Sequence, residues 1–94
     1  MDRFDVAHIR EQGQDIIIIP LARSFGHQSA TEQSKVYTAL QIAANSAGLR
    51  GRVVAVWDAG RGRMAFLAPE EWSRFCRSLS WQFIARNING TLRC

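Results

Sequence analysis

The chain has 94 residues, of which 47% are hydrophobic and 21% charged, and it carries a net charge of +4. This length suits one domain, and the composition excludes a disordered or fibrous protein. The apolar runs are shorter than the roughly 18–20 residues that a membrane helix needs, and the N-terminus lacks the basic-then-apolar pattern of a signal peptide. We therefore expect a single domain over residues 1–94, located in the cytoplasm and away from membranes.

Cysteine and histidine content argues against a disulfide framework and against a structural metal. The two cysteines are Cys76 and Cys94, no CxxC pair is present, and His8 and His27 lie far apart in the chain. Disulfides are rare in the cytoplasm, and zinc sites use closely spaced ligands. We expect no metal and no cofactor, an inert core thiol at Cys76, and a mobile thiol at Cys94 that can oxidise between chains.

The N-terminal residues predict a β-hairpin. Residues 4–10 alternate between two faces, and residues 15–21 include four consecutive isoleucines, which favour a strand because branched side chains fit a pleated surface. Gly13 between them suits the positive φ of a tight turn. Pro20 cannot donate to a ladder, so it should lie at a strand end or edge.

The next segment predicts a helix with a defined start and end. Ser29 and Glu32 match a capping box, and Gly48 supplies a left-handed stop after about Ala47. A core stripe follows at helical spacing: Val36, Leu40, Ala43, Ala44 and Ala47.

The C-terminal half repeats the strand–strand–helix pattern. Residues 52–57 and 63–67 predict a second hairpin around the glycine-rich turn 58–62. A helix is expected from Pro69 until Gly90 ends it, with Ser78 and Ser80 marking a kink between two helical pieces. Its second apolar stripe contains Trp81, Ile84 and Ile88.

The order ββαββα predicts an α+β domain with a four-stranded, mainly antiparallel sheet and two helices packed on one face. The strands are apolar on both sides, so the second face of the sheet needs a cover. A second copy of the chain is the simplest cover, and the stripe Trp81, Ile84 and Ile88 is another candidate contact for self-association. Alternatively, the second helix bends and covers more of the same core.

Several segments resemble a group of small uncharacterised bacterial proteins of about this length. They are residues 10–13, 16–21, 56–58, 62–69 and 87–89, so the resemblance spans nearly the whole chain. It implies a single domain and brings no activity and no functional residue.

Residues for catalysis are sparse. His27 can be combined with Ser24 or Ser29 and with Asp58 into a Ser/His/Asp set, but no spacing requires that geometry and GxSxG is absent. Residues 23–27 lead into a helix N-terminus, where free amides attract anions. The capping box uses some of those amides, so an ordinary connection is favoured and we do not expect an enzyme. His8 is expected as a strand residue with a satisfied ring.

The arginines favour an anionic partner. Arg61 and Arg63 lie at the predicted hairpin tip, Arg50 and Arg52 lie at the opposite end of that hairpin, and Arg23 could join either cluster. Trp57 beside the tip could stack on a base if exposed. Against this, these arginines can simply be solvated, and the sheet lacks the exposed aromatics of sheet-based RNA binding.

Two functions follow as expectations. The first is a small non-enzymatic interaction or accessory domain that forms a homodimer or binds an unknown protein partner. The second is a nucleic-acid-binding protein that uses Arg61 and Arg63.

Overall fold

Two strands and a tight turn open the computed structural model, which describes residues 3–94. β1 (Arg3–Glu11) and β2 (Gln14–Pro20) pair antiparallel, with Ala7 opposite Ile18. Gln12 and Gly13 have φ values of 50° and 78°, and this left-handed pair matches the twist of the flanking strands. The predicted N-terminal hairpin is confirmed.

The first long helix begins and ends where the sequence predicts. After a 3-10 helix, η1 (Arg23–His27), α1 spans Ala30–Ser46, and Ser29 Oγ accepts a hydrogen bond of 3.1 Å from the Glu32 amide. Only this half of the predicted capping box is formed, because the Glu32 carboxylate instead lies 3.6 Å from Lys35 Nζ. Gly48 follows at φ +88°, the left-handed stop.

A parallel strand pair lies at the centre of the sheet. A helix of 17 residues runs about 25 Å, so α1 carries the chain back along the sheet. β3 (Arg52–Gly60) therefore runs parallel to β2, with Ile17 opposite Val53, and β4 (Arg63–Leu67) returns antiparallel to β3. The sheet is thus mixed, whereas we expected mainly antiparallel pairing.

A fifth strand replaces the expected end of the last helix. β5 (Gly90–Arg93) pairs antiparallel with β1, with Leu92 opposite Phe4, and gives the order β4-β3-β2-β1-β5. The expectations of four strands and of Gly90 as a helix stop are therefore wrong. β5 pairs with the edge of β1 that faces away from β2, and the buried Leu92 adds to the core beside Val6.

The second helix is divided into short pieces. These are η2 (Glu70–Trp72), α2 (Ser73–Arg77) and α3 (Trp81–Asn87). The break between α2 and α3 confirms the predicted kink, and Ser80 Oγ caps α3 by accepting from the Phe83 amide at 3.1 Å.

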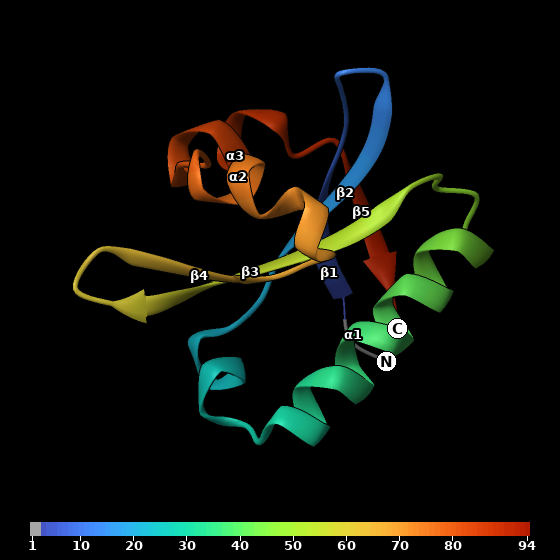
Figure 1. Ribbon diagram of the computed structural model, residues 1–94. Helices are drawn as coiled ribbons and strands as arrows, with labels where there is room; N and C mark the ends of the chain where they lie inside the picture. The colour runs from blue at the N-terminus through green and yellow to red at the C-terminus, as the bar shows by residue number, and fades with distance from the viewer. Residues whose placement is uncertain (1–2) are drawn as a thin grey trace.

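The helices cover both faces of the sheet (Figure 1). Ile17 and Ile19 pack on the α1 side and Ile16 and Ile18 on the α2–α3 side, and all four are 0% exposed. The expectation that both helices pack on one face of the sheet is therefore wrong, because strands that are apolar on both sides need a covering layer on each face. The chain itself supplies the second layer, so the reason for covering that face with a second copy is removed. The result is one α+β domain.

Candidate functional site

The β3–β4 hairpin projects from the body of the molecule and carries arginines at its tip (Figure 1). The turn consists of Arg61 and Gly62, at φ 56° and 73°, between the end of β3 and the start of β4. The register between Asp58 and Gly60 is shifted, which marks a bulge just before the turn. Arg61 and Arg63 are both exposed.

Arg61 occupies a backbone conformation that arginine does not favour. A left-handed residue with a Cβ costs about 1–2 kcal/mol, and this turn position usually holds Asn, Asp or Gly. Strain of this kind is a reason to look for function at the residue that bears it. The tip therefore presents a guanidinium where the turn alone favours another residue.

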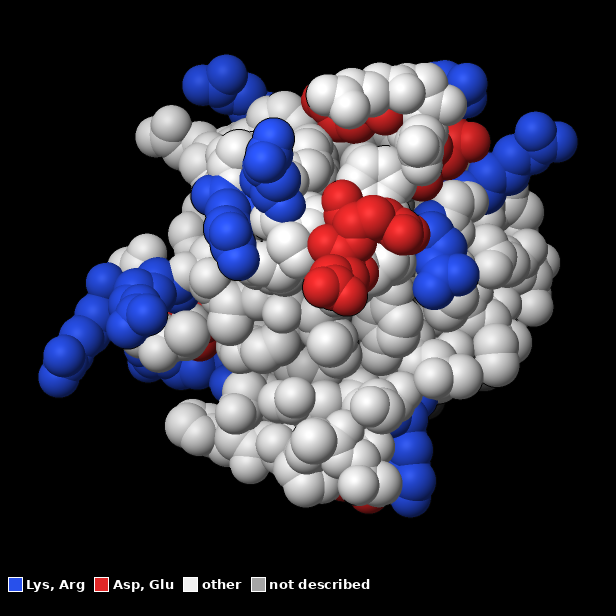
Figure 2. Space-filling model, viewed as in Figure 1, with Lys and Arg blue, Asp and Glu red and all other residues white. Residues whose placement is uncertain are grey.

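Arg23 joins this tip from η1. Its Nη2 lies 3.8 Å from Asp58 Oδ2, while Asp58 Oδ1 accepts a 2.7 Å hydrogen bond from the Gly60 amide. Arg23 Nη2 also lies 3.3 Å from the position that a Cβ on Gly60 would take. We call Arg23, Arg61 and Arg63 the tip arginines; Figure 2 shows blue side chains gathered at the left, where the hairpin ends.

A hollow of about 410 Å³, here the tip hollow, separates the hairpin from α2 and α3. Gly62 and Met64 line it from the hairpin, and Arg77 and Trp81 line it from the helices. Trp81 is 38% exposed and Arg77 is exposed. An aromatic face and a fourth guanidinium thus lie near the tip arginines.

Cys76 also lines the tip hollow, but its thiol has low reactivity. Its side chain is buried, and that burial raises the pKa of the thiol from 9.0 to about 11. A protonated thiol is a poor nucleophile and a poor metal ligand. This agrees with the expected inert core thiol.

A second hollow of about 350 Å³ lies where η1 meets β3. His27 and Asp58 both line it, together with Arg23. Neither serine of the proposed catalytic set lines it, and Ser29 Oγ is already used in capping α1. The structure therefore brings the histidine and the carboxylate near one another without a nucleophile.

Trp57 is not available for stacking on a base. It is 8% exposed and packs edge-on against Phe25 with ring centroids 4.8 Å apart. A Cβ on Gly26 would lie 2.6 Å from Trp57 Nε1, so the η1 backbone also lies directly on the indole. The condition attached to the sequence hypothesis, an exposed Trp57, is not met.

Arg50 and Arg52 lie apart from the tip, at the start of β3. The Arg50 carbonyl accepts a 2.9 Å hydrogen bond from His8 Nε2, which satisfies the histidine ring as expected. Arg52 lies beside Tyr37, whose hydroxyl donates to the Val53 carbonyl at 2.7 Å. Burial raises the pKa of Tyr37, and the nearby Arg52 guanidinium opposes that rise.

The stripe predicted for self-association is mostly internal. Ile84 is 2% exposed and belongs to the core under α2 and α3, and Ile88 packs against the same core. Trp81 is the member of the stripe that remains exposed. Self-association itself stays a prediction.

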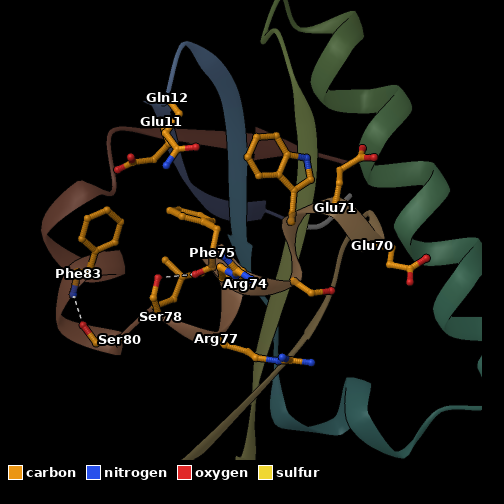
Figure 3. Close-up of a pocket in the computed structure, with 13 residues that line it drawn as sticks. Glu11, Gln12, Glu70, Glu71, Arg74, Phe75, Arg77, Ser78, Ser80 and Phe83 are labelled. Atoms are coloured by element: carbon orange, nitrogen blue, oxygen red, sulfur yellow. Dashed lines mark hydrogen bonds between the residues drawn. The ribbon is translucent and has the colours of Figure 1, made fainter.

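A larger hollow, of about 1040 Å³, is shown in Figure 3 and shares Arg77, Leu79 and Ser80 with the tip hollow. Phe75 and Phe83 line it, Glu11 approaches from the β1–β2 hairpin, and Arg74 and Arg77 lie on α2. Its rim carries both signs of charge, so it does not select an anion. Arg77 lines both hollows and joins them into one surface.

Within residues 3–94, no three or more His, Cys, Asp and Glu side chains gather into a group that could hold a metal. No helix in the same range has both the length and the apolar character to span a membrane.

Comparison with known proteins finds no match: no family model, no curated protein and no solved structure matches the chain. The resemblance to small bacterial proteins carries no activity either. Function is therefore inferred from the charge and geometry of the site.

Proposed function

We propose that this protein binds nucleic acid, with the tip arginines contacting phosphates. The observation that carries the proposal is Arg61, held in a left-handed turn at the end of a projecting hairpin and flanked by Arg63 and Arg23. The protein acts by binding and not by catalysis, and we propose that it does so in the cytoplasm.

Guanidinium chemistry supports this choice of partner. Arginine presents a planar fork of donors that matches two phosphate oxygens at once, which a lysine ammonium does not. Basic residues here are arginine in all positions but Lys35. A two-stranded ribbon is also narrow enough to approach the groove or the backbone of a nucleic acid.

The opposing charge at the tip is small. Asp58 is the carboxylate that contacts Arg23, at 3.8 Å, and one of its oxygens is engaged by the Gly60 amide. An exposed pair of this kind contributes little to stability, so Arg23 exchanges it for a phosphate at low cost.

Binding to DNA and RNA across a salt titration tests the proposal. The variant Arg61→Asn/Arg63→Gln removes two charges, and Asn suits the left-handed turn, so the fold is retained. We expect binding to weaken about tenfold and the slope of log affinity against log salt to fall by about 2, one for each lost phosphate contact.

The matched control is Arg86→Gln/Arg93→Gln. It removes the same charge from two exposed residues, Arg86 on α3 and Arg93 on β5, the strand at the opposite edge of the sheet from β4. Equal weakening in both variants indicates a general charge effect and contradicts a site at the tip. No binding at low salt contradicts nucleic-acid binding altogether.

A second candidate function is a small non-enzymatic protein-interaction or accessory domain that self-associates. Two large hydrophobic side chains of the described residues are exposed, Ile42 at 62% and Trp81 at 38%. Exposed apolar side chains can mark a protein contact. The mass in solution, measured by light scattering over a range of concentrations, tests it: a single-chain mass throughout removes the homodimer.

A further inference from the structure

We propose that the nucleic acid is single-stranded and that an unpaired base stacks on Trp81 in the tip hollow. This inference rests on the proposed function, because the tip arginines must hold the phosphates beside the stacked base. It adds a ligand class and a base-binding residue that phosphate contacts alone do not provide.

The geometry places an aromatic face next to positive charge. Trp81 begins α3, where the Ser80 cap fixes the helix start, and it lines the same hollow as Gly62 of the hairpin turn. Arg77 lines that hollow from α2. A base in the hollow would therefore have Arg77 on the helix side and the turn that carries Arg61 on the hairpin side.

The lining of the hollow suits the face of a base. Met64, Phe66 and Leu79 supply apolar walls, polar surface makes up about as much of the lining, and Trp81 is exposed. Its volume, about 410 Å³, lies in the range of pockets that take small organic molecules. Base–aromatic stacking tolerates any base, since every base has a π face, so the expected binding has little sequence preference.

The hollow also discriminates between single and double strands. Bases in a duplex already stack on their neighbours, and taking one out requires unstacking and unpairing. A single strand presents its bases without that cost. Of the three tryptophans, Trp57 is buried and Trp72 packs edge-on against Phe75 at 6.3 Å, which leaves Trp81 as the exposed face near the tip.

Fluorescence quenching of the intact protein tests the inference, with mixed-sequence single-stranded DNA and RNA, the matching duplex and an abasic single strand as probes. We expect the single strands to quench tryptophan emission and to bind about tenfold tighter than the abasic strand. Trp81→Phe should remove the quenching, whereas Trp72→Phe, which also removes one indole, should keep it. Trp81→Leu should weaken binding of single strands about tenfold and leave binding of the abasic strand unchanged.

The outcomes separate this inference from the proposed function. Equal binding of duplex, abasic and single strands, lost in Arg61→Asn/Arg63→Gln, keeps the tip site and overturns stacking on Trp81. Quenching that survives Trp81→Phe and disappears in Trp72→Phe overturns the choice of tryptophan. If Trp81→Leu unfolds at a different temperature from the wild type, its weaker binding is no longer evidence for stacking. The test then rests on whether single strands quench the fluorescence of the wild type and fail to quench that of Trp81→Phe.

Discussion

At the scale of single residues, burial controls the chemistry of Cys76. The side chain packs beneath α2 among Ile16, Ile18 and Val54, and burial raises the pKa of its thiol from 9.0 to about 11. The thiolate, which is the reactive form, is therefore scarce near neutral pH. Cys94 is exposed and provides an internal comparison in the same chain.

We predict that iodoacetamide labels Cys94 in the folded protein and leaves Cys76 unmodified until the chain is unfolded. The raised pKa also makes stability depend on pH. As pH rises from about 9 to about 11, the unfolded chain loses the thiol proton while the folded chain still holds it, so the free energy of unfolding falls. Peptide mass spectrometry after labelling and denaturation at several pH values measure both effects.

The control for that prediction is Cys76→Ala. Tyr37 also has a raised pKa, chiefly because of its burial, which both proteins share; the smallest of the causes is the charge of Cys76, which Cys76→Ala removes. The difference in stability between wild type and Cys76→Ala should narrow as pH rises through this range. A difference that does not change with pH contradicts the raised pKa.

Single residues also show where sequence reasoning reaches its limit. The Ser29 cap and the left-handed Gly13 and Gly48 depend on near neighbours in the chain, and all three are as predicted. Trp57 and Trp81 depend on tertiary packing. Nothing in the local sequence tells that η1 folds over Trp57 or that Trp81 lies across a hollow from Gly62.

At the scale of elements, Asn89 connects α3 to the edge strand β5. Its Oδ1 accepts from the His8 amide at 2.9 Å, and its Nδ2 donates to the His8 carbonyl at 2.8 Å. Its own amide donates to the Val6 carbonyl at 2.9 Å. The side chain therefore continues the pairing of β1 by one position before β5 begins.

We predict that Asn89→Ala destabilises the protein by about 1–2 kcal/mol, because two side-chain hydrogen bonds to β1 are lost. Amide hydrogen exchange at His8 should become faster, since its N–H loses its acceptor. Asn45→Ala is the control: it loses a local 2.8 Å bond to the Leu49 carbonyl at the end of α1. Unchanged exchange at His8 in Asn89→Ala would contradict this role of Asn89.

The elements differ in how much of their pairing is local. The β1–β2 and β3–β4 hairpins are both predicted correctly, because each is closed by a two-residue turn with glycine. The parallel pairing of β2 with β3 is set by the direction in which α1 returns the chain. β5 has four residues and one buried side chain, so it is recognised as a strand only through its pairing with β1.

At the scale of the whole molecule, the sheet has two separate cores, one on each face. Val6, Ile17, Leu40 and Val53 lie on the α1 side, and Ile16, Val54 and Ile84 lie on the α2–α3 side. The sequence already required a cover for both faces, because its strands are apolar on both sides. It did not reveal whether that cover comes from the same chain or from a second one.

Ile84 and Ile42 distinguish the two possibilities, since one is 2% exposed in the core beneath α3 and the other is 62% exposed on α1. We predict that Ile84→Ala lowers the free energy of unfolding by about 2–4 kcal/mol, as a cavity in a packed core does, whereas Ile42→Ala changes it by less than about 0.5 kcal/mol. Because the core lies within one chain, the effect of Ile84→Ala should be the same at low and high protein concentration. A midpoint of thermal unfolding that rises with protein concentration in the wild type and loses this dependence in Ile84→Ala would place Ile84 at a contact between copies instead.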